Sequence, residues 1–391
     1  MNEYPTDVEP NYSRSYVEVD LDAIRFNLKG EREIIGPNRK LMVILKANAY
    51  GHGAVPCMRA IEDLADAYGV AIPEEALELR RAGTKKMILI LGHSDVGYLK
   101  TLMEADISLT VYDYENAVIL SKIATENGLK AKIHIAVDTG MSRIGMAAVK
   151  DNVALVQRMA SYPGIEITGM FTHFACADQK DKTSAREQFA RFTQFADWLS
   201  EAGIEVPVKH AANSAAIMEM PETYLDMVRC GITMYGIYPS DEVDRAKLPL
   251  RPLMSLFSTV TYVKDIGPGD EVSYGGTYTT TRKTRMGVLP YGYADGFLRS
   301  LSNKAVVMTS EGPARQCGRI CMDMSMIDLT DKPNVGVGSE VEVFGKNNSI
   351  EELAAAGGTI PYELVCAVSK RVPRMYLRGG QVVEKELLLR L

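Results

Sequence analysis

Short apolar runs alternate with helical segments between about residues 40 and 240. Eight runs have the pattern of buried strands, and they cover residues 41–46, 67–72, 87–92, 107–113, 132–138, 167–173, 206–210 and 228–235. Apolar residues recur at helical spacing between them, in residues 58–66, 74–82, 95–105, 115–127, 153–161 and 184–202. Alternating strands and helices predict a parallel sheet with helices packed outside it.

Eight strand–helix units in a segment of this length favour a closed (β/α)8 barrel, the TIM barrel. The alternative is an open doubly wound sheet, which usually carries a G-x-G-x-x-G turn after its first strand. The turn at residues 47–53 reads Ala-Asn-Ala-Tyr-Gly-His-Gly and lacks that spacing. A strand at 16–20 and a helix at 21–35 come before the barrel strands. We therefore expect a barrel, with its chemistry at the C-terminal ends of the strands.

The pattern changes near residue 250, where two prolines flank Arg251. Beyond this joint, segments rich in Val, Thr, Tyr and Ile are separated by glycine-bearing turns, which is typical of antiparallel strands. These segments are 258–266, 271–281, 286–293, 305–309, 320–328 and 340–344, with one helix near 350–356. The sequence thus predicts a barrel domain at 1–247 and a mostly antiparallel β domain at 248–391.

Composition agrees with two soluble domains. The 391 residues exceed what one compact domain usually holds. A net charge of −6 gives no reason to expect nucleic acid or an anionic membrane as a partner. No apolar stretch approaches the ~20 residues of a membrane span, and the polar N-terminus is unlike a secretory signal, so we expect a cytoplasmic protein. Cys317 and Cys321 lack the further ligands that a zinc site needs, so no metal is expected.

Lys46 stands where five consecutive apolar residues, 41–45, run into a turn. Desolvation at the mouth of a core favours the neutral, nucleophilic amine over the ammonium ion. Such an amine forms a Schiff base with an aldehyde. Most lysines at strand ends are nevertheless solvated, with their stems lying over apolar surface, so Lys46 alone does not decide the function.

Polar side chains also follow several other apolar runs, and in a barrel these strand ends meet at one mouth. They are Asp138 with Arg143, His173, His210, Ser214, and Arg229 with Gly231. Taken singly, Arg143 is explained by pairing with Asp138, and His173 as a satisfied core histidine. Ser214 at a helix start and the backbone N–H groups of Gly231 and Ile232 are donors suited to phosphate. A lysine, an arginine and a phosphate site together indicate pyridoxal 5′-phosphate (PLP).

Eight motifs then match one family. Residues 46–53, KANAYGHG, resemble the PLP-attachment motif of bacterial alanine racemases. Residues 138–145, 170–175, 213–216, 229–232, 273–275, 292–296 and 318–323 are similar to further signatures of that family. The match spans nearly the whole chain in the family's order, which makes the set specific.

The resemblance implies an isomerase that interconverts L- and D-alanine through a PLP aldimine and two bases, supplying D-alanine for peptidoglycan. It also implies an obligate homodimer, in which the β domain of one subunit faces the barrel mouth of the other. Lys46 would hold PLP and act as one base. Tyr274 of the other subunit would be the second base.

The resemblance assigns further roles around the cofactor. The implied phosphate ligands are Tyr50, Ser214, Gly231, Ile232 and Tyr362. Arg229 would face the pyridine nitrogen, and because arginine stays charged it would leave that nitrogen unprotonated and limit transamination. Arg143 would contact the phenolic oxygen of PLP and, with Met322 of the other subunit, the substrate carboxylate. His173 would connect Tyr274 to Arg229, and Tyr293 would line the channel by which substrate enters.

Two positions depart from the family pattern. Ala136 stands where many members carry a lysine whose carbamate orients the arginine, so Arg143 needs another brace, such as bound chloride or another anion. Met324 stands where glutamine is usual after Cys-Met-Asp.

Three other functions are weighed against alanine racemisation. A serine or broad-specificity racemase is the first, since a methyl and a hydroxymethyl group differ little; retention of Tyr362 favours alanine. The second is a PLP decarboxylase with the same domain plan, against which the full motif set argues. The third is a PLP carrier without enzymatic activity, which would leave the β domain and Tyr274 without a role.

Overall fold

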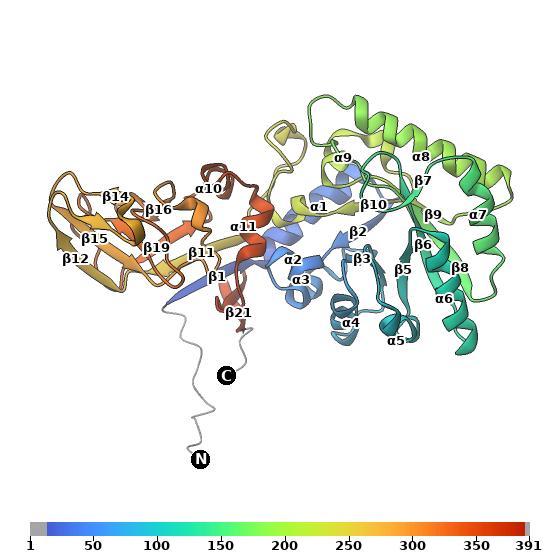
Figure 1. Cartoon of the computed structure of the whole chain (residues 1–391), viewed down its shortest axis with the longest axis horizontal. Coiled ribbons are helices and arrows are strands. Elements are labelled where there is room, and N and C mark those ends of the chain that lie inside the picture. The colour runs from blue at the N-terminus through green and yellow to red at the C-terminus, as the bar shows by residue number, and fades with distance from the viewer. Residues whose placement is uncertain (1–13, 388–391) are drawn as a thin grey trace, which may run out of the picture. The chain divides into compact units, whose positions relative to one another are not determined.

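The structure is a computed structural model and describes residues 14–387. The chain divides into two compact units (Figure 1). The first, here called the barrel unit, comprises Ile24–Ala49 and Ala54–Arg251. The second, the β unit, combines residues 14–23, Tyr50–Gly53 and residues 252–387.

Eight parallel strands form the barrel unit in the order β10-β2-β3-β4-β5-β6-β8-β9. They are β2 Lys40–Ile44, β3 Ala67–Val70, β4 Met87–Ile90, β5 Ile107–Val111, β6 Ala131–Asp138, β8 Ile165–Phe171, β9 Val208–His210 and β10 Met227–Cys230. Two backbone hydrogen bonds, Asp226 N to Lys209 O (3.2 Å) and Arg229 N to Ala212 O (3.0 Å), nearly close the ring. The short strand β7, Met146–Ala147, pairs with β6. The predicted (β/α)8 barrel is confirmed.

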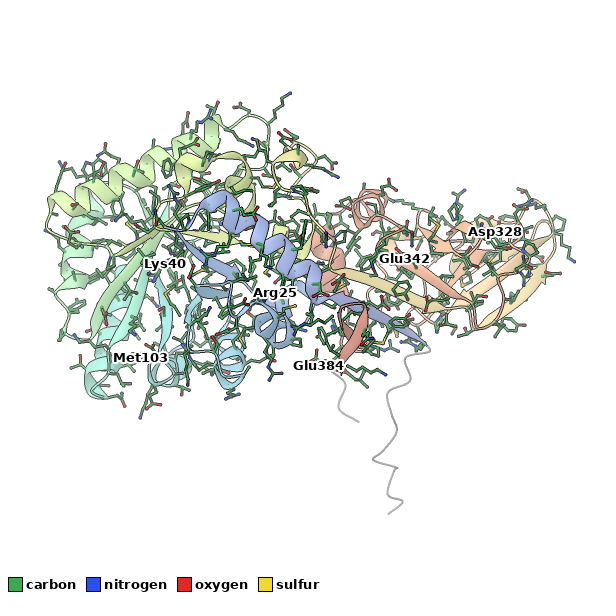
Figure 2. All side chains as sticks on the ribbon, turned by 180° about the vertical axis from the view of Figure 1, so that it is seen from behind. Arg25, Lys40, Met103, Asp328, Glu342 and Glu384 are labelled. Carbon is green, nitrogen blue, oxygen red and sulfur yellow. The ribbon has the colours of Figure 1, made fainter. Side chains whose placement is uncertain are left out.

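Helices connect these strands and lie on their outer side (Figure 1). They are α1 Leu21–Ile35, α3 Ala54–Ile61, α4 Pro73–Arg81, α5 Leu99–Glu104, α6 Tyr114–Glu126, α7 Asp151–Ala160, α8 Thr183–Glu201 and α9 Ser214–Glu219. Arg25 of α1, labelled in Figure 2, donates to the carbonyl oxygen of Ala60 in α3 (2.7 Å) and so ties these two helices together. Within residues 14–387, no helix combines the length and apolar character needed to cross a bilayer.

The β unit contains a seven-stranded sheet in the order β17-β16-β19-β11-β1-β20-β21. Its strands are β1 Ser15–Asp20, β11 Met254–Thr259, β16 Val306–Thr309, β17 Gly312–Arg315, β19 Glu340–Phe344, β20 Arg374–Arg378 and β21 Gln381–Glu386. A three-stranded sheet contains β12 Tyr262–Ile266, β15 Thr284–Leu289 and β18 Ser325–Asp328, and a two-stranded one contains β13 Glu271–Val272 and β14 Tyr278–Thr279. Helices α10, Ile350–Gly357, and α11, Pro361–Ala367, complete the unit. Every pairing is antiparallel except β1 with β20, so the mostly antiparallel prediction is confirmed.

Three features differ from the sequence-based expectation. Strand β1, assigned there to the barrel domain, pairs with β11 and β20 in the β unit. The segment 258–266, taken as one strand, is divided between β11 and β12, which belong to different sheets. The run 228–235 is a strand only as far as Cys230, because the chain then enters the 3-10 turn η3, Ile232–Tyr235. That turn is buried and mostly apolar, so its composition resembles that of a buried strand.

Candidate functional site

Lys46 begins a left-handed helical turn at the end of strand β2. The turn, α2 Lys46–Tyr50, has φ between 52° and 53° at every residue from 47 to 50. L-residues other than glycine avoid this region, at a cost of roughly 1–2 kcal/mol each. Ala49 N donates to Leu45 O (2.8 Å) and closes the turn. The lysine therefore lies at a strand end, as the sequence predicts. The left-handed conformation that follows it was not predictable, because residues 47–50 contain no glycine.

Neighbouring groups hold this strained segment in place. Glu75 of α4 accepts the N–H of Ala47 through Oε1 (2.6 Å) and the N–H of Ala71 through Oε2 (2.9 Å). Directly after the turn, a Cβ at Gly51 would lie 2.1 Å from the carbonyl oxygen of Val365, so only glycine fits there. Strain concentrated on four residues and held by their surroundings is common at functional sites.

Arg229 of β10 is fixed inside the barrel unit. It is 4% exposed and donates to the carbonyl oxygens of Thr172 (2.7 Å), His210 (2.9 Å) and Ala211 (2.9 Å). Within residues 14–387, no carboxylate pairs with it. Burial, and then the charge of Arg143, lower the pKa of Arg229 to about 9. The guanidinium is thus an uncompensated positive charge in a fixed orientation.

His173, just after β8, extends this arrangement. Its Nδ1 lies 3.3 Å from Nη2 of Arg229, and because a guanidinium only donates, Nδ1 is the acceptor. Burial, and then the positive charges of Arg229, Arg143 and Lys46, together lower the pKa of His173 to about 3. His173 is therefore neutral near pH 7 and carries its proton on Nε2. His173 thus contacts Arg229, and the implied link from His173 to Tyr274 stays a prediction.

A second histidine pair, not predicted as a unit, continues on the other side of Arg229. Nη1 of Arg229 lies 3.1 Å from Nδ1 of His210, and Nε2 of His210 lies 2.9 Å from Nδ1 of His134. Both rings are fully buried, and burial lowers the pKa of each. The signal in the sequence was the position of His134, a polar residue in the middle of the apolar run 132–138.

The predicted phosphate donors of the barrel unit lie together. Ser214 is the first residue of α9, and the preceding Asn213 caps the helix by accepting from Ala216 N (3.1 Å). Gly231 N donates to Ser214 Oγ (2.9 Å), which brings the loop after β10 against the start of α9. Ser214 and Ile232 are 6% and 1% exposed, so an anion held here would be largely shielded from water.

The two predicted phosphate ligands of the β unit are also neighbours. The rings of Tyr50 and Tyr362 lie with centroids 6.0 Å apart at an angle of 47°. Tyr50 comes from the end of the left-handed turn and Tyr362 from α11. Helix α11 was not predicted, although the sequence resemblance assigns a role to Tyr362.

Arg143 is exposed in the loop between β6 and β7. The alternative explanation, a pair with Asp138, does not apply among the described residues, because Asp138 Oδ1 accepts the backbone N–H of Gly140 (2.9 Å) and Ser142 (3.1 Å) instead. Ala136 is 1% exposed on β6. The anion suggested as a brace for Arg143 stays a prediction.

Tyr274, Met322 and Tyr293 belong to loops of the β unit that are joined by hydrogen bonds. Ser273 Oγ donates to Arg319 O (2.6 Å), and Tyr293 N donates to Cys321 O (2.9 Å). The side chains project outward, with Tyr274 68%, Met322 53% and Tyr293 42% exposed. These three predicted site residues therefore share one surface region of the β unit, which we call the Tyr274 surface.

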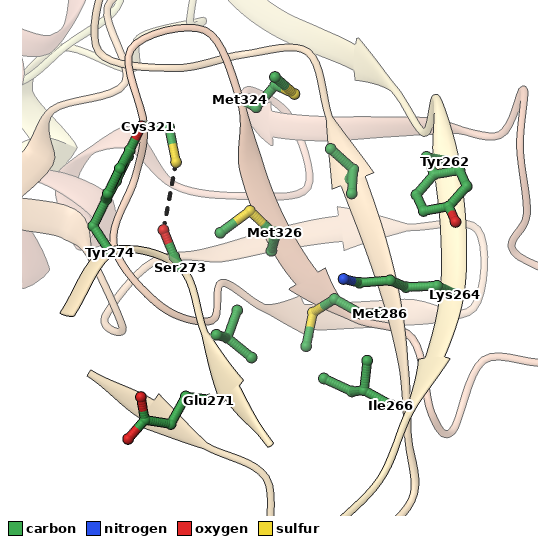
Figure 3. Close-up of a pocket in the computed structure, with 12 residues that line it drawn as sticks. Tyr262, Lys264, Ile266, Glu271, Ser273, Tyr274, Met286, Cys321, Met324 and Met326 are labelled. Carbon is green, nitrogen blue, oxygen red and sulfur yellow. Dashed lines mark hydrogen bonds between the residues drawn. The ribbon is translucent and has the colours of Figure 1, made fainter. Parts of the chain in front are cut away.

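A pocket of about 420 Å³ opens beside Tyr274 (Figure 3). Ser273 and Cys321 form one side of it, with Ser273 Oγ 3.4 Å from Cys321 Sγ. The three-stranded sheet contributes Tyr262 and the thioethers of Met286 and Met326. Met324, one of the two departures from the family pattern, also lines the pocket and is 51% exposed. The Tyr274 surface is thus continuous with an apolar hollow.

The charges in the barrel unit favour an anionic ligand. Lys46, Arg143 and Arg229 all lie near enough to His173 to lower its pKa. Like charges repel each other, so an anion bound among them would relieve that repulsion. Ser214 and Gly231 add donors of the kind that phosphate oxygens accept. The donor set therefore fits a molecule with a phosphate group and an aldehyde for the lysine.

Comparison with known proteins identifies a family over nearly the full length. A model described as "Alanine racemase, N-terminal domain" matches residues 19–239, and one described as "Alanine racemase, C-terminal domain" matches residues 253–376. The chain is 45% identical over 374 residues to the alanine racemase of Clostridium perfringens (strain SM101 / Type A), covering 94% of this chain and 97% of that one. It is 48% identical over 368 residues to the alanine racemase of Methanococcus maripaludis, covering 93% and 98%.

Solved structures give the same result. The alanine racemase of Clostridium difficile 630 matches with a TM-score of 0.93 at 38% identity, covering 96% of this chain and 99% of that one. The alanine racemase of Bacillus anthracis with bound L-Ala-P matches with a TM-score of 0.91 at 36% identity, covering 97% and 99%. With both domain models matched in order and relatives of this identity aligned almost end to end, the chain belongs to the alanine racemase family.

Proposed function

We propose that this protein is an alanine racemase that interconverts L- and D-alanine. The observation that carries the proposal is Lys46, held at the end of β2 by a strained turn and grouped with Arg143 and Arg229 around His173. PLP is the cofactor of this family. When bound, PLP withdraws electrons from the Cα of the amino acid joined to it, which makes the α-proton removable.

The proposed cofactor ligands follow from this placement. Lys46 would hold the aldehyde carbon, and the phosphate would take hydrogen bonds from Ser214, Gly231, Ile232, Tyr50 and Tyr362. The contact from Gly231 N to Ser214 Oγ supports the barrel part of this set by placing the two residues side by side, and the N–H of Gly231 would exchange this acceptor for a phosphate oxygen. Arg229 would face the ring nitrogen, and its three carbonyl partners would keep it there as a permanent donor.

Two residues would move the proton. Lys46 Nζ would remove or return it on one face of Cα, and Tyr274 Oη of a second subunit would do so on the other. Because Arg229 occupies Nδ1 of His173, the Nε2–H of that ring is the remaining donor. We infer that it donates to Tyr274 Oη and so holds this oxygen in its accepting form.

The substrate would be bound through its carboxylate. Arg143 and Met322 of the second subunit would contact this group, with an anion near Ala136 bracing Arg143, and Tyr293 would line the channel by which substrate enters. We propose alanine rather than serine because the relatives are named alanine racemases and Tyr362 is present. Comparing kcat/KM for L-alanine and L-serine tests this choice.

The homodimer is part of the same proposal. Tyr274 and Met322 are large apolar residues at 68% and 53% exposure, beside an apolar pocket, and such surfaces mark interaction sites. A second copy of the chain covering the Tyr274 surface would bring both side chains to a barrel mouth. We further propose a cytoplasmic enzyme that supplies D-alanine for peptidoglycan.

The two-base scheme is tested by Tyr274→Phe, which removes only the phenolic oxygen. Racemisation should fall by about 10²–10⁴-fold in both directions, the usual loss when a general base is removed, while PLP content measured by absorbance stays unchanged. Tyr262→Phe is the matched control, because Tyr262 lines the same pocket and is 56% exposed. Unchanged rates in Tyr274→Phe would exclude the scheme.

A further inference from the structure

Glu31 of helix α1 is a buried carboxyl group inside the barrel unit, with 0% of its surface exposed. Its Oε1 is hydrogen-bonded to Thr233 Oγ1, and the Cys230 thiol contacts the carboxyl group. Its Oε2 has no partner in hydrogen-bond geometry within the described residues. No lysine or arginine of residues 14–387 forms an ion pair with it. Burying a carboxylate without a counter-charge is costly, so packing alone does not explain its presence.

Hydrogen bonds lead from Glu31 to the proposed phosphate site. Thr233 Oγ1 lies 2.9 Å from Ser214 Oγ, and Ser214 Oγ also accepts from Gly231 N (2.9 Å). Thr233 is fully buried and Ser214 is 6% exposed, so water does not compete strongly for either hydroxyl. One hydroxyl, that of Thr233, thus separates the carboxyl group from Ser214, a proposed phosphate donor.

The hydrogen atoms available to Glu31, Thr233 and Ser214 decide what this hydrogen-bonded relay does. Each hydroxyl has a single hydrogen to donate. When Glu31 is ionised, Thr233 donates to it and can no longer donate to Ser214. Thr233 Oγ1 is then an acceptor beside Ser214 Oγ and competes with the phosphate for the single hydrogen of Ser214. When Glu31 is protonated, it donates to Thr233 and Thr233 donates to Ser214. The hydrogen of Ser214 is then available to a phosphate oxygen.

We propose that Glu31 is a positioning residue for the cofactor phosphate, acting through Thr233 on the direction in which Ser214 donates. Its protonated form leaves the Ser214 hydrogen directed to the phosphate, and its ionised form makes Thr233 a competing acceptor for that hydrogen. The inference rests on the proposed function, which makes Ser214 a phosphate ligand. Beyond the proposed function, it makes phosphate binding depend on the proton of the Glu31 carboxyl group, which itself does not contact the phosphate.

The surroundings allow both forms near neutral pH. Burial raises the pKa of Glu31 to about 7, against the weaker effects of its contacts with Cys230 and Thr233. The titratable neighbours are Cys230 on β10, whose pKa burial raises well above its usual value, and Tyr224, whose pKa burial raises to about 12. Both stay neutral around pH 7. Arg39 lies over the Tyr224 ring, 5.5 Å from its centroid, and is positive throughout. Bound phosphate, being negative, would favour the protonated form of Glu31 further.

The test compares two ligands that form no bond to Lys46, pyridoxamine 5′-phosphate and pyridoxamine. Their dissociation constants for the full-length protein stripped of PLP are measured calorimetrically between pH 5.5 and 8.5. In the wild type, the preference for the phosphorylated ligand should fall by about tenfold as pH rises through 7, the loss expected for one hydrogen bond to a charged group. Glu31→Gln, whose amide donates at every pH, should keep the full preference at pH 8.5. The phosphate group of the ligand also titrates in this pH range, but it does so for every variant, so its effect cancels when the variants are compared with the wild type.

Two further variants separate the possible failures. Ser214→Ala should lower the preference at pH 6; if it does not, the proposed phosphate site is wrong, whatever Glu31 does. If Ser214→Ala has its effect but Glu31→Gln keeps the wild-type pH dependence, the role of Glu31 is excluded. Thr233→Val cuts the relay and retains the carboxyl group, so the pH dependence should disappear and return in Thr233→Ser. Persistence of the pH dependence in Thr233→Val would overturn the relay, and this pair also serves if Glu31→Gln does not fold.

Discussion

The two regions proposed to carry the chemistry are built in opposite ways. In the barrel unit, Arg229 is 4% exposed and is held by three carbonyl oxygens and two imidazoles. On the Tyr274 surface of the β unit, Tyr274 is 68% exposed at the edge of an apolar pocket. The first region has its geometry fixed before any ligand arrives. The second has hydrogen-bonded loops, but its side chains are only partly covered by neighbouring groups.

This difference indicates a division of tasks. Buried polar groups with all their partners define one arrangement and resist change, which suits a region that must orient a cofactor. Exposed apolar side chains beside a hollow gain stability only when a second surface covers them, which suits a region completed by another subunit. Substitutions in the two regions should therefore fail in different ways.

The largest expected effect comes from combining a defect in each region. Lys46→Ala and Tyr274→Phe should each lose at least about 10²-fold in racemisation rate, because each lacks one base. Co-expressed in equal amounts, the two variants should recover about one quarter of wild-type activity, since half of the dimers are mixed and each mixed dimer has one intact site.

The chiral assay is run on preparations co-expressed at several ratios, with each variant alone as the control. No recovery at any ratio would mean that both bases come from the same subunit, and the Tyr274 surface would then need another explanation.

The next largest expected effect is on the free energy of unfolding, which substitutions in the two regions should change by different amounts. Arg229→Met takes a donor away from three buried carbonyl oxygens, of which that of His210 still accepts from Thr172 N. At about 1–3 kcal/mol for each oxygen left without a donor, we expect the free energy of unfolding to fall by about 2–6 kcal/mol. Tyr274→Phe removes one exposed hydroxyl and should change it by no more than about 0.5 kcal/mol. Urea unfolding followed by fluorescence and circular dichroism measures both. Similar losses in the two variants would contradict the contrast in how these residues are held.

The smallest expected effect is on how the free energy of unfolding depends on pH, which should differ between a buried carboxyl group of the barrel unit and an exposed one of the β unit. The pKa of Glu31 is raised to about 7 in the folded chain from 4.5, so its contribution is fully present below pH 4.5 and is lost as pH rises through 7. Glu31→Gln should therefore gain up to about 3 kcal/mol on the wild type between pH 4.5 and pH 8. Glu271→Gln is the matched control on the exposed pocket rim and should show no such gain. A constant difference between wild type and Glu31→Gln at all pH values would exclude the titration.

Much of the barrel could be predicted because its strands are buried on both faces. Such strands are continuous apolar runs, and residues 41–46 or 107–113 differ from β2 and β5 by no more than a few terminal residues. The pairing of β1 could not be predicted, since alternating burial marks a strand but carries no information about a partner more than 230 residues away. The division of residues 258–266 between β11 and β12 could not be predicted either, because the two strands have similar compositions and sequence does not show that they join different sheets.

Sequence alone could propose site residues where a residue type dictates its chemistry, as for Lys46 and Arg229. Glu31 could not be found this way. It lies in the charged stretch Glu31-Arg32-Glu33 of α1, where sequence gives no sign that one carboxyl group is buried and the next is not. Only the helix orientation decides which side chain faces Thr233.

The turn that presents Lys46 has a consequence for chirality. Ala47 and Ala49 are L-residues in a left-handed helical conformation, which is the mirror image of the one that L-alanine prefers and the one that D-alanine adopts without strain. A D-alanine at either position would keep the turn and lose the steric penalty, whereas in the right-handed α3 it would disrupt the helix. The protein that we propose to exchange the two hands of alanine thus holds two of its own alanines in the geometry of the opposite hand.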